Sequence, residues 1–227
     1  MDMRKRFIIK PGKRFRLKDV DPGATPGYKD KSAAESALAE NVERLSRFQY
    51  RLYAEGRRAL LLILQGMDAA GKDGTIRHVM GPLNPQSCKV TSFKAPTAEE
   101  LGHDFLWRVH RATPSRGEIG IFNRSHYEDV LVVRVKGLAP TPVWSKRYEQ
   151  INAFERILTA NDVTVLKFFL HVSSAEQKRR LVERLRDPKK NWKVNPRTST
   201  SASAGTPTWR RTRTPSGSAA RTMPRGS

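Results

Sequence analysis

The stretch Ala59–Met80, ALLLILQGMDAAGKDGTIRHVM, decides the fold of this chain. It begins with the apolar run Ala59–Leu64, which is too short for a lone buried helix and typical of a strand covered on both faces. A glycine-containing turn, Gln65–Lys72, follows, and then a segment without proline in which apolar residues have helical spacing. Strand, glycine loop and helix in this order predict a phosphate-binding P-loop at Gly66–Asp73.

The loop has the chemistry of an anion site. Gly66 and Gly71 allow the backbone to curl so that successive N–H groups point at a phosphate, and the next helix adds its positive end. Lys72 supplies a cation for the transferred phosphate. The residues expected to surround the phosphate are Gly66, Ala69, Ala70, Gly71, Lys72, Asp73, Gly74 and Thr75.

Two residues depart from the general P-loop pattern. Asp73 stands where Ser or Thr normally holds magnesium, and Thr75 follows two residues later. Asp68 places a carboxylate inside the loop, where bound phosphates would repel it unless a metal lies between them. The alternative is an ordinary glycine turn, but the spacing and the strand–loop–helix context favour a phosphate site. The loop alone does not identify the substrate.

Composition limits the class of protein. With 227 residues the chain is large enough for one α/β domain, and a second full domain is not expected. The single cysteine, Cys88, excludes an intramolecular disulfide, and no apolar run has the length of a membrane span. The N-terminus lacks the apolar core of a secretory signal. We therefore expect a cytoplasmic protein without a membrane partner.

The charge points to a polyanionic partner. The net charge is +21, from 43 Lys and Arg against 22 Asp and Glu. Nucleic acid, an anionic membrane face and a chain of phosphates would all suit this field, and charge alone does not choose among them. Residues 1–30 are expected to form a basic arm, which is either solvated or in contact with a phosphate polymer.

Outside the loop, the patterns predict further helices and strands. A helix is expected over Ser32–Arg58, with a stripe that packs on the sheet or on another subunit, formed by Leu38, Val42, Leu45, Phe48 and Leu52. Lys89–Phe93 reads as a second strand, and Lys94 at its end is a candidate phosphate contact. A helix over Ala98–Arg111 is expected next, with Thr97 as its N-cap and Glu100 completing a capping box. His103 and His110 lack neighbouring ligands and are interpreted as structural.

The third predicted strand, Glu118–Phe122, is followed by polar residues. In P-loop enzymes a carboxylate for magnesium stands here, but this chain has the neutral Asn123. Arg124 is a candidate catalytic group that can hold phosphoryl oxygens. Glu128 and Asp129 either serve as metal ligands or simply favour the positive end of the next helix.

The last third predicts a core helix, a strand and a basic helix. Trp144–Leu158 has an apolar stripe of core residues, and Val163–Leu170 is the fourth strand. A basic helix over Ala175–Arg186 starts after a cap at Ser173 or Ser174. We interpret it as a lid over the phosphates rather than a solvated face, with Arg179, Arg180 and Lys190 as phosphate contacts.

Several motifs together resemble one family. LLILQGMDAAGKDGT, SFKAPT, HDFLWRVH, GEIGIFNRSHYEDVLVVRV, INAFERIL, KFFLHVS and DPKKNWK are similar to segments of the polyphosphate kinase 2 family, in the family's order. The form FNRSHYEDV resembles the branch that accepts nucleoside monophosphates as well as diphosphates. The resemblance covers Phe7–Pro196. It implies a P-loop kinase-like, three-layer α/β/α sandwich with a parallel sheet and a helical lid, usually a homodimer or homotetramer.

The resemblance also implies roles for individual residues. Asp68 becomes a carboxylate associated with Mg²⁺, Lys72 the lysine that bridges phosphates, and Arg124 the arginine after the third strand. The expected reaction is in-line attack of an AMP or ADP oxygen on a terminal phosphorus of inorganic polyphosphate. Many family members have aspartate in place of Asn123, so the second metal carboxylate stays open.

The chain changes character after Pro196. Residues 197–227 contain no Asp, Glu or Lys and show no helical or strand period, which is typical of a disordered segment. We hypothesise that the reading frame shifts near Pro196, so that the C-terminal part of the domain over 31–196 is missing and activity is in question. A natural basic tail is the alternative, and resequencing the gene decides between them.

Three other functions compete with this expectation. The first is an ATP-dependent nucleotide kinase. The second is a nucleic-acid-binding protein that uses the basic arm and tail, although no specific nucleic-acid partner is expected. The third is a poorly folded remnant without catalysis.

Overall fold

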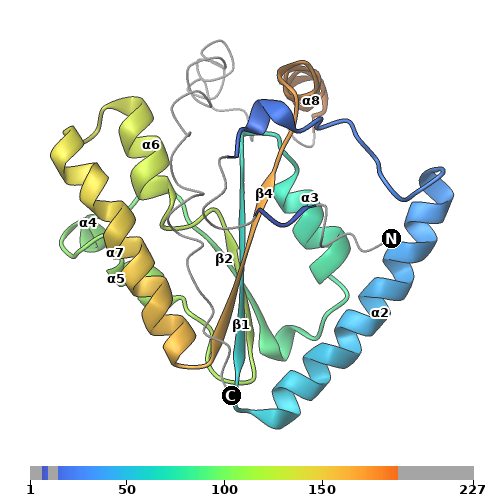
Figure 1. Cartoon of the computed structure of the whole chain (residues 1–227), viewed down its shortest axis with the longest axis horizontal. Coiled ribbons are helices and arrows are strands. Elements are labelled where there is room, and N and C mark those ends of the chain that lie inside the picture. Colours follow the sequence, from blue (N-terminus) through green and yellow to red (C-terminus); the bar gives the residue numbers. More distant parts are fainter. Residues whose placement is uncertain (1–6, 10–14, 189–227) are drawn as a thin grey trace.

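The computed structural model describes residues 7–9 and 15–188 (Figure 1). Residues 1–6 and 10–14 of the predicted basic arm, the candidate phosphate contact Lys190 and the whole of residues 197–227 lie outside the described residues. The predicted division into arm, domain and tail therefore stays a prediction. Within the described ranges, no helix is long and apolar enough to cross a membrane.

A four-stranded parallel sheet forms the centre of the molecule. Its strands are β1 (Ala59–Gly66), β2 (Cys88–Ser92), β3 (Ile119–Asn123) and β4 (Val163–Leu170). The order across the sheet is β2-β3-β1-β4, so β1 has a neighbour on each side. The four strands predicted from the sequence are confirmed. Their carboxyl ends lie at one edge, which is where parallel sheets bind ligands.

Helices cover both faces of the sheet, as the predicted α/β/α sandwich requires (Figure 1). One face carries α4 (Ala98–Leu101), α5 (Trp107–Arg111), α6 (Glu128–Lys136) and α7 (Thr141–Ala160). The other face carries α2 (Lys31–Glu55) and α3 (Lys72–Thr75), which continues as the π-helical turn η2 (Ile76–Met80). The helix α8 (Ser174–Arg186) lies at the carboxyl end of β4.

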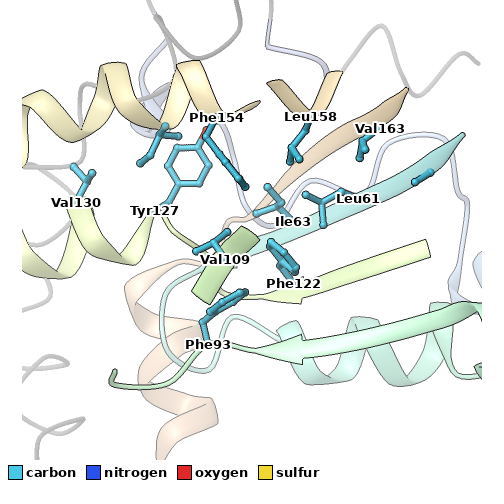
Figure 2. Packing of buried hydrophobic residues seen from close by; sticks show 12 residues of the cluster. Leu61, Ile63, Phe93, Val109, Phe122, Tyr127, Val130, Phe154, Leu158 and Val163 are labelled. Carbon is cyan, nitrogen blue, oxygen red and sulfur yellow. The ribbon is translucent and has the colours of Figure 1, made fainter. Parts of the chain in front are cut away.

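The apolar run of β1 supplies both halves of the core. Leu61 and Ile63 belong to the cluster beneath α5, α6 and α7, which Figure 2 shows with Phe122 and Phe154. The intervening residues of β1 belong to the cluster beneath α2 and η2. Side chains alternate between the two faces of a strand, so a continuous apolar run is what a strand buried on both faces needs.

Only part of the predicted apolar stripe of α2 packs on the core, and the alternative that the stripe packs on another subunit stays a prediction. Leu45 and Leu52 pack against the core as expected, but Leu38 is 38% and Phe48 57% exposed. Gln49, next to Phe48, is buried in its place. Its side-chain amide donates to Asn84 O and accepts from Asn84 N, so this polar group is satisfied inside the protein.

The single helix predicted over residues 98–111 is wrong. The chain forms two short helices, α4 and α5, because Gly102 ends the first and the carboxylate of Asp104 accepts from Leu106 N at 2.9 Å. The capping box of Thr97 and Glu100 is confirmed. His103 stacks on Trp107 in this break, with ring centroids 4.0 Å apart.

A buried charged network connects β4 to α7 and to the segment after β3. Glu155 accepts hydrogen bonds from Tyr127 Oη at 2.8 Å and from Lys167 Nζ at 2.6 Å. His126 Nε2 lies 3.4 Å from the same carboxylate. Burial alone would raise the pKa of Glu155, but the His126 hydrogen bond and the Lys167 charge outweigh burial and lower it. The network thus holds the chain close to Arg124.

Replacing Glu155 with Gln is expected to lower the free energy of unfolding by about 2–3 kcal/mol, because Lys167 loses its buried counter-charge. The melting temperature should fall by about 5–10 °C at neutral pH. Since the pKa is lowered in the folded state, the stabilisation is complete above the ordinary value of 4.5 and is lost as pH falls through the folded-state pKa. Melting curves from pH 8 to pH 3 should therefore converge in acid. Glu149→Gln, an exposed change on the same helix, should have no effect.

Candidate active site

The glycine loop leaves β1 in a tightly restricted space. A Cβ atom on Gly66 would lie 2.8 Å from the carbonyl oxygen of Leu170, so a side chain there would push the loop away from β4. Ala69 and Gly71 have φ values of 62° and 104°, and Thr75 N donates to Gly71 O at 2.9 Å to begin α3. The predicted loop is therefore a curled backbone between two strand ends.

Lys72 folds back over this loop. Its Nζ donates to Gly66 O at 2.7 Å and to Met67 O at 3.1 Å, and only 8% of the residue is exposed. Burial lowers the pKa of the ammonium, and the nearby Arg124 guanidinium lowers it further. A buried cation held by backbone carbonyls can exchange those carbonyls for phosphate oxygens.

The strand register brings Arg124 to the loop. Leu64 of β1 is in register with Asn123 of β3, and Arg124 N donates to Leu64 O at 3.0 Å. Arg124 has a φ of 66°, a left-handed conformation that costs about 1–2 kcal/mol for a residue with a Cβ. Its guanidinium donates to Asp68 Oδ1 at 3.0 Å. Strain of this kind at a strand end is frequent in functional sites.

Asp73 and Asn123, which stand where a hydroxyl and a carboxylate would hold magnesium in the general P-loop pattern, contact each other. Asn123 Nδ2 donates to Asp73 Oδ1 at 2.8 Å, across 50 positions of the chain. The sequence singled out each residue separately but did not predict that they meet.

The two candidate metal ligands after β3 have different surroundings. Burial raises the pKa of Glu128. With the Gln65 amide turned so that its oxygen accepts from Ser125 Oγ, its nitrogen donates to Glu128 Oε1 at 3.0 Å. Asp129 points toward the guanidinium groups of Arg108 and Arg147, at 3.5 and 3.9 Å. The arrangement favours Glu128 over Asp129 as a group near bound phosphate.

Helix α8 contacts the loop from the side of β4. Gln177 Nε2 donates to Asp68 O at 2.8 Å, and Arg180 Nη1 lies 3.2 Å from Ala69 O and 3.3 Å from Ala70 O. Arg179, whose phosphate contact stays a prediction, pairs with Glu176 and Glu183 on its own helix, and Arg180 also pairs with Glu176. The helix thus brings Arg180 to the loop and leaves Arg179 exposed.

A cleft of about 340 Å³ opens beside the loop, between α8 and the N-terminal segment. It is lined by Pro22, Gly23, Ala70, His171, Val172, Ser173, Glu176 and Arg180. Lys94 lies at the same edge of the sheet but two strands away from β1, exposed at the end of β2, where its carbonyl accepts from Arg108. The described hydrogen bonds and ion pairs of Lys94 do not join it to the loop.

Gln177 and Gln65 are site residues that sequence reasoning missed. Both are buried polar side chains, at 8% and 7% exposure. Gln177 lies in a helix whose residues are mostly polar, so the sequence pattern did not distinguish it as a buried residue. Gln65 directly follows the apolar run of β1, and a polar residue just before the end of a buried strand was the available hint.

Replacing Gln177 with Leu is expected to lower kcat/KM for phosphate transfer about tenfold, because Asp68 O loses its donor and the loop loses one of its fixed points. Gln177→Asn, whose amide is too short to reach, should behave in the same way. Steady-state kinetics measure both variants, and wild-type kcat/KM in both would show that this hydrogen bond is dispensable.

Among the described residues, no group of three or more His, Cys, Asp or Glu side chains could enclose a metal ion. Magnesium at a phosphate site needs only one or two carboxylates, since phosphates and water complete its shell. Asp68 on the loop and Asp73 at the start of α3 supply two carboxylates, and both lie close enough to the Lys72 ammonium to offset part of the lowering of its pKa by burial.

Comparison with known proteins gives consistent results. Residues 28–207 match the family model "Polyphosphate kinase 2". The AMP/ADP-polyphosphate phosphotransferase of Meiothermus ruber is 54% identical over 190 residues, covering 83% of this chain and 71% of that protein. The ADP-polyphosphate phosphotransferase of Rhodopseudomonas palustris is 47% identical over 203 residues, covering 84% and 70%. The crystal structure of polyphosphate kinase 2 from Arthrobacter aurescens has a TM-score of 0.85 at 42% identity, covering 90% of this chain and 74% of that one.

Proposed function

Because the chain belongs to the polyphosphate kinase 2 family, we propose that it transfers phosphate between inorganic polyphosphate and AMP or ADP at the site around Lys72. The observation that carries this proposal is the convergence of two cationic side chains and one carboxylate on a single curled loop. Lys72 belongs to the loop and folds back onto it, and Arg124 reaches it from the end of β3. Asp68 of the loop pairs with Arg124.

The chain's own groups act mainly by position and charge. Backbone N–H groups of the loop and the start of α3 would hold the phosphate that is transferred. Lys72 would leave the carbonyls of Gly66 and Met67 and follow the charge of that phosphate as it moves to the acceptor. Arg124 would contact its equatorial oxygens with the planar guanidinium. Little covalent work is left to the protein, because both substrates carry their own reacting oxygens.

Magnesium is the cation that we propose for this site. Mg²⁺ held by Asp68 and Asp73 would screen the repulsion between the polyphosphate and nucleotide anions. Arg180 would support the loop from α8 through the carbonyls of Ala69 and Ala70.

The donor-swap assay tests the proposed function. Purified protein is incubated with AMP or ADP and Mg²⁺, with either long-chain polyphosphate or ATP as the only phosphate donor. We expect product with polyphosphate and little with ATP. Turnover with ATP alone would identify an ATP-dependent nucleotide kinase instead.

A homo-oligomer is the assembly that we propose. Large aromatic side chains are exposed on α2, at 57% for Phe48, 73% for Tyr50 and 57% for Tyr53. Exposed aromatic groups on one helix are typical of a surface covered by another chain. Light scattering after size exclusion should give a mass above 25.7 kDa.

A further inference from the structure

Two unusual residues of this chain form one contact, and the contact has a chemical meaning. In the general P-loop pattern, magnesium is held by a hydroxyl after the loop lysine and by a carboxylate from the end of a neighbouring strand. This chain has the carboxylate Asp73 after the lysine and the amide Asn123 at the end of β3. The carboxylate therefore follows the loop lysine, where the general pattern has a neutral hydroxyl. The neutral side chain ends the strand, where the general pattern has a carboxylate.

The two side chains are joined by a hydrogen bond. Asn123 Nδ2 donates to Asp73 Oδ1 at 2.8 Å. An amide can donate to a carboxylate at this distance, whereas two carboxylates would repel each other there. The identity of one residue therefore constrains the other.

We propose that Asn123 is a positioning residue that orients Asp73, and that Asp73 replaces the strand-end carboxylate as the second acidic group toward the phosphate-bound metal. The proposal rests on the proposed function of the site and names the acidic group that the sequence left open. Of the two acidic residues that follow β3, Asp129 is paired with two arginines rather than with a residue of the loop.

The geometry explains how Asn123 can act without touching substrate. Its backbone is held in the sheet by the register of β3 with β1, opposite Leu64. Asp73 stands in the first turn of α3 directly after Lys72, where a carboxylate can adopt several rotamers. A donor fixed in the sheet selects the rotamer in which Oδ1 faces β3, and the second carboxylate oxygen then has a defined direction.

Three variants test the pair against the wild type. They are Asn123→Asp, Asp73→Asn and the exchange variant that carries both changes. Asn123→Asp places two carboxylates together, so it should lower both the melting temperature and kcat/KM, the latter about a hundredfold. Asp73→Asn keeps a neutral hydrogen bond and should stay folded, but should need about tenfold more Mn²⁺ for half-maximal activity.

The exchange variant restores one donor and one carboxylate with reversed direction. Its melting temperature should return to the wild-type value, and kcat/KM should recover at least about tenfold over Asn123→Asp. Recovery would not occur if either residue acted alone. Additive effects of the two substitutions on both quantities would overturn the proposal, as would an unchanged Mn²⁺ requirement in Asp73→Asn.

A readout without turnover separates this proposal from the proposed function. Saturating Mn²⁺ with inorganic tripolyphosphate should raise the melting temperature of the wild type and the exchange variant, and should raise that of Asp73→Asn less. This pattern supports the pair even if the donor-swap assay shows no transfer. An equal rise in all four proteins would overturn the role of Asp73 toward the metal.

Discussion

Replacing Lys72 with Met is expected to lower kcat for polyphosphate-dependent phosphorylation by about 10³-fold or more, because the loop loses the buried ammonium that would follow the charge of the transferred phosphate. The variant should remain folded. Met fills a similar volume and removes the cost of burying an ammonium, which offsets the donors lost by Gly66 O and Met67 O. We expect a change in melting temperature within about 3 °C.

Lys72→Arg is the matched control for charge. The guanidinium keeps a cation but cannot fit a site in which Lys72 is 8% exposed, so activity should still fall about a hundredfold. Turnover is measured as ATP or ADP formed from polyphosphate at saturating Mg²⁺. If the Met variant keeps a tenth of wild-type activity, Lys72 is not the group that stabilises the transferred phosphate. If both variants still bind nucleic acid with a steep salt dependence, the alternative function of a nucleic-acid-binding protein would be favoured.

Replacing Arg124 with Gly is expected to separate activity from stability. The left-handed φ of 66° costs nothing for glycine, so the release of strain should raise the melting temperature by about 2–4 °C. The ion pair with Asp68 contributes little to stability, since the two side chains are 42% and 35% exposed. Activity should nevertheless fall by about 10²–10³-fold, because the guanidinium no longer contacts the phosphoryl oxygens.

Arg124→Ala distinguishes the two effects. Alanine also removes the guanidinium but keeps a Cβ in the strained conformation, so its activity should match that of Arg124→Gly while its melting temperature should not rise. Equal melting temperatures for the two variants would show that the backbone at this position stores no strain. Normal turnover in both would remove Arg124 from the mechanism.

The fold could be predicted from the sequence because its signals are local. The apolar run of β1, the capping box of Thr97 and the strand Val163–Leu170 each specify an element within a few residues. The wrong continuous helix over 98–111 has the same origin. The apolar residues have helical spacing both before and after the break, but the Asp104 side chain stabilises a turn between α4 and α5.

The site was only half predictable because its contacts are not local. The loop glycines, Lys72 and Arg124 belong to a recognisable spacing, whereas Gln177 and Asp68 meet across 109 positions. Arg179 and Arg180 are adjacent and chemically equal in the sequence. Which of them reaches the loop depends on the rotation of α8, fixed by Ser173 at its N-terminus and by Gln177 against the loop.

The strand order has a consequence for how the protein is made. β1 leaves the ribosome early, but its two partners, β3 and β4, begin only at Ile119 and Val163. Parallel pairing over such separations raises contact order and slows folding, and β1 has neither of its partner strands until β3 has been synthesised. A nascent chain that ends before Arg180 carries the whole glycine loop, yet it lacks one of the two α8 side chains that hold the loop's carbonyls.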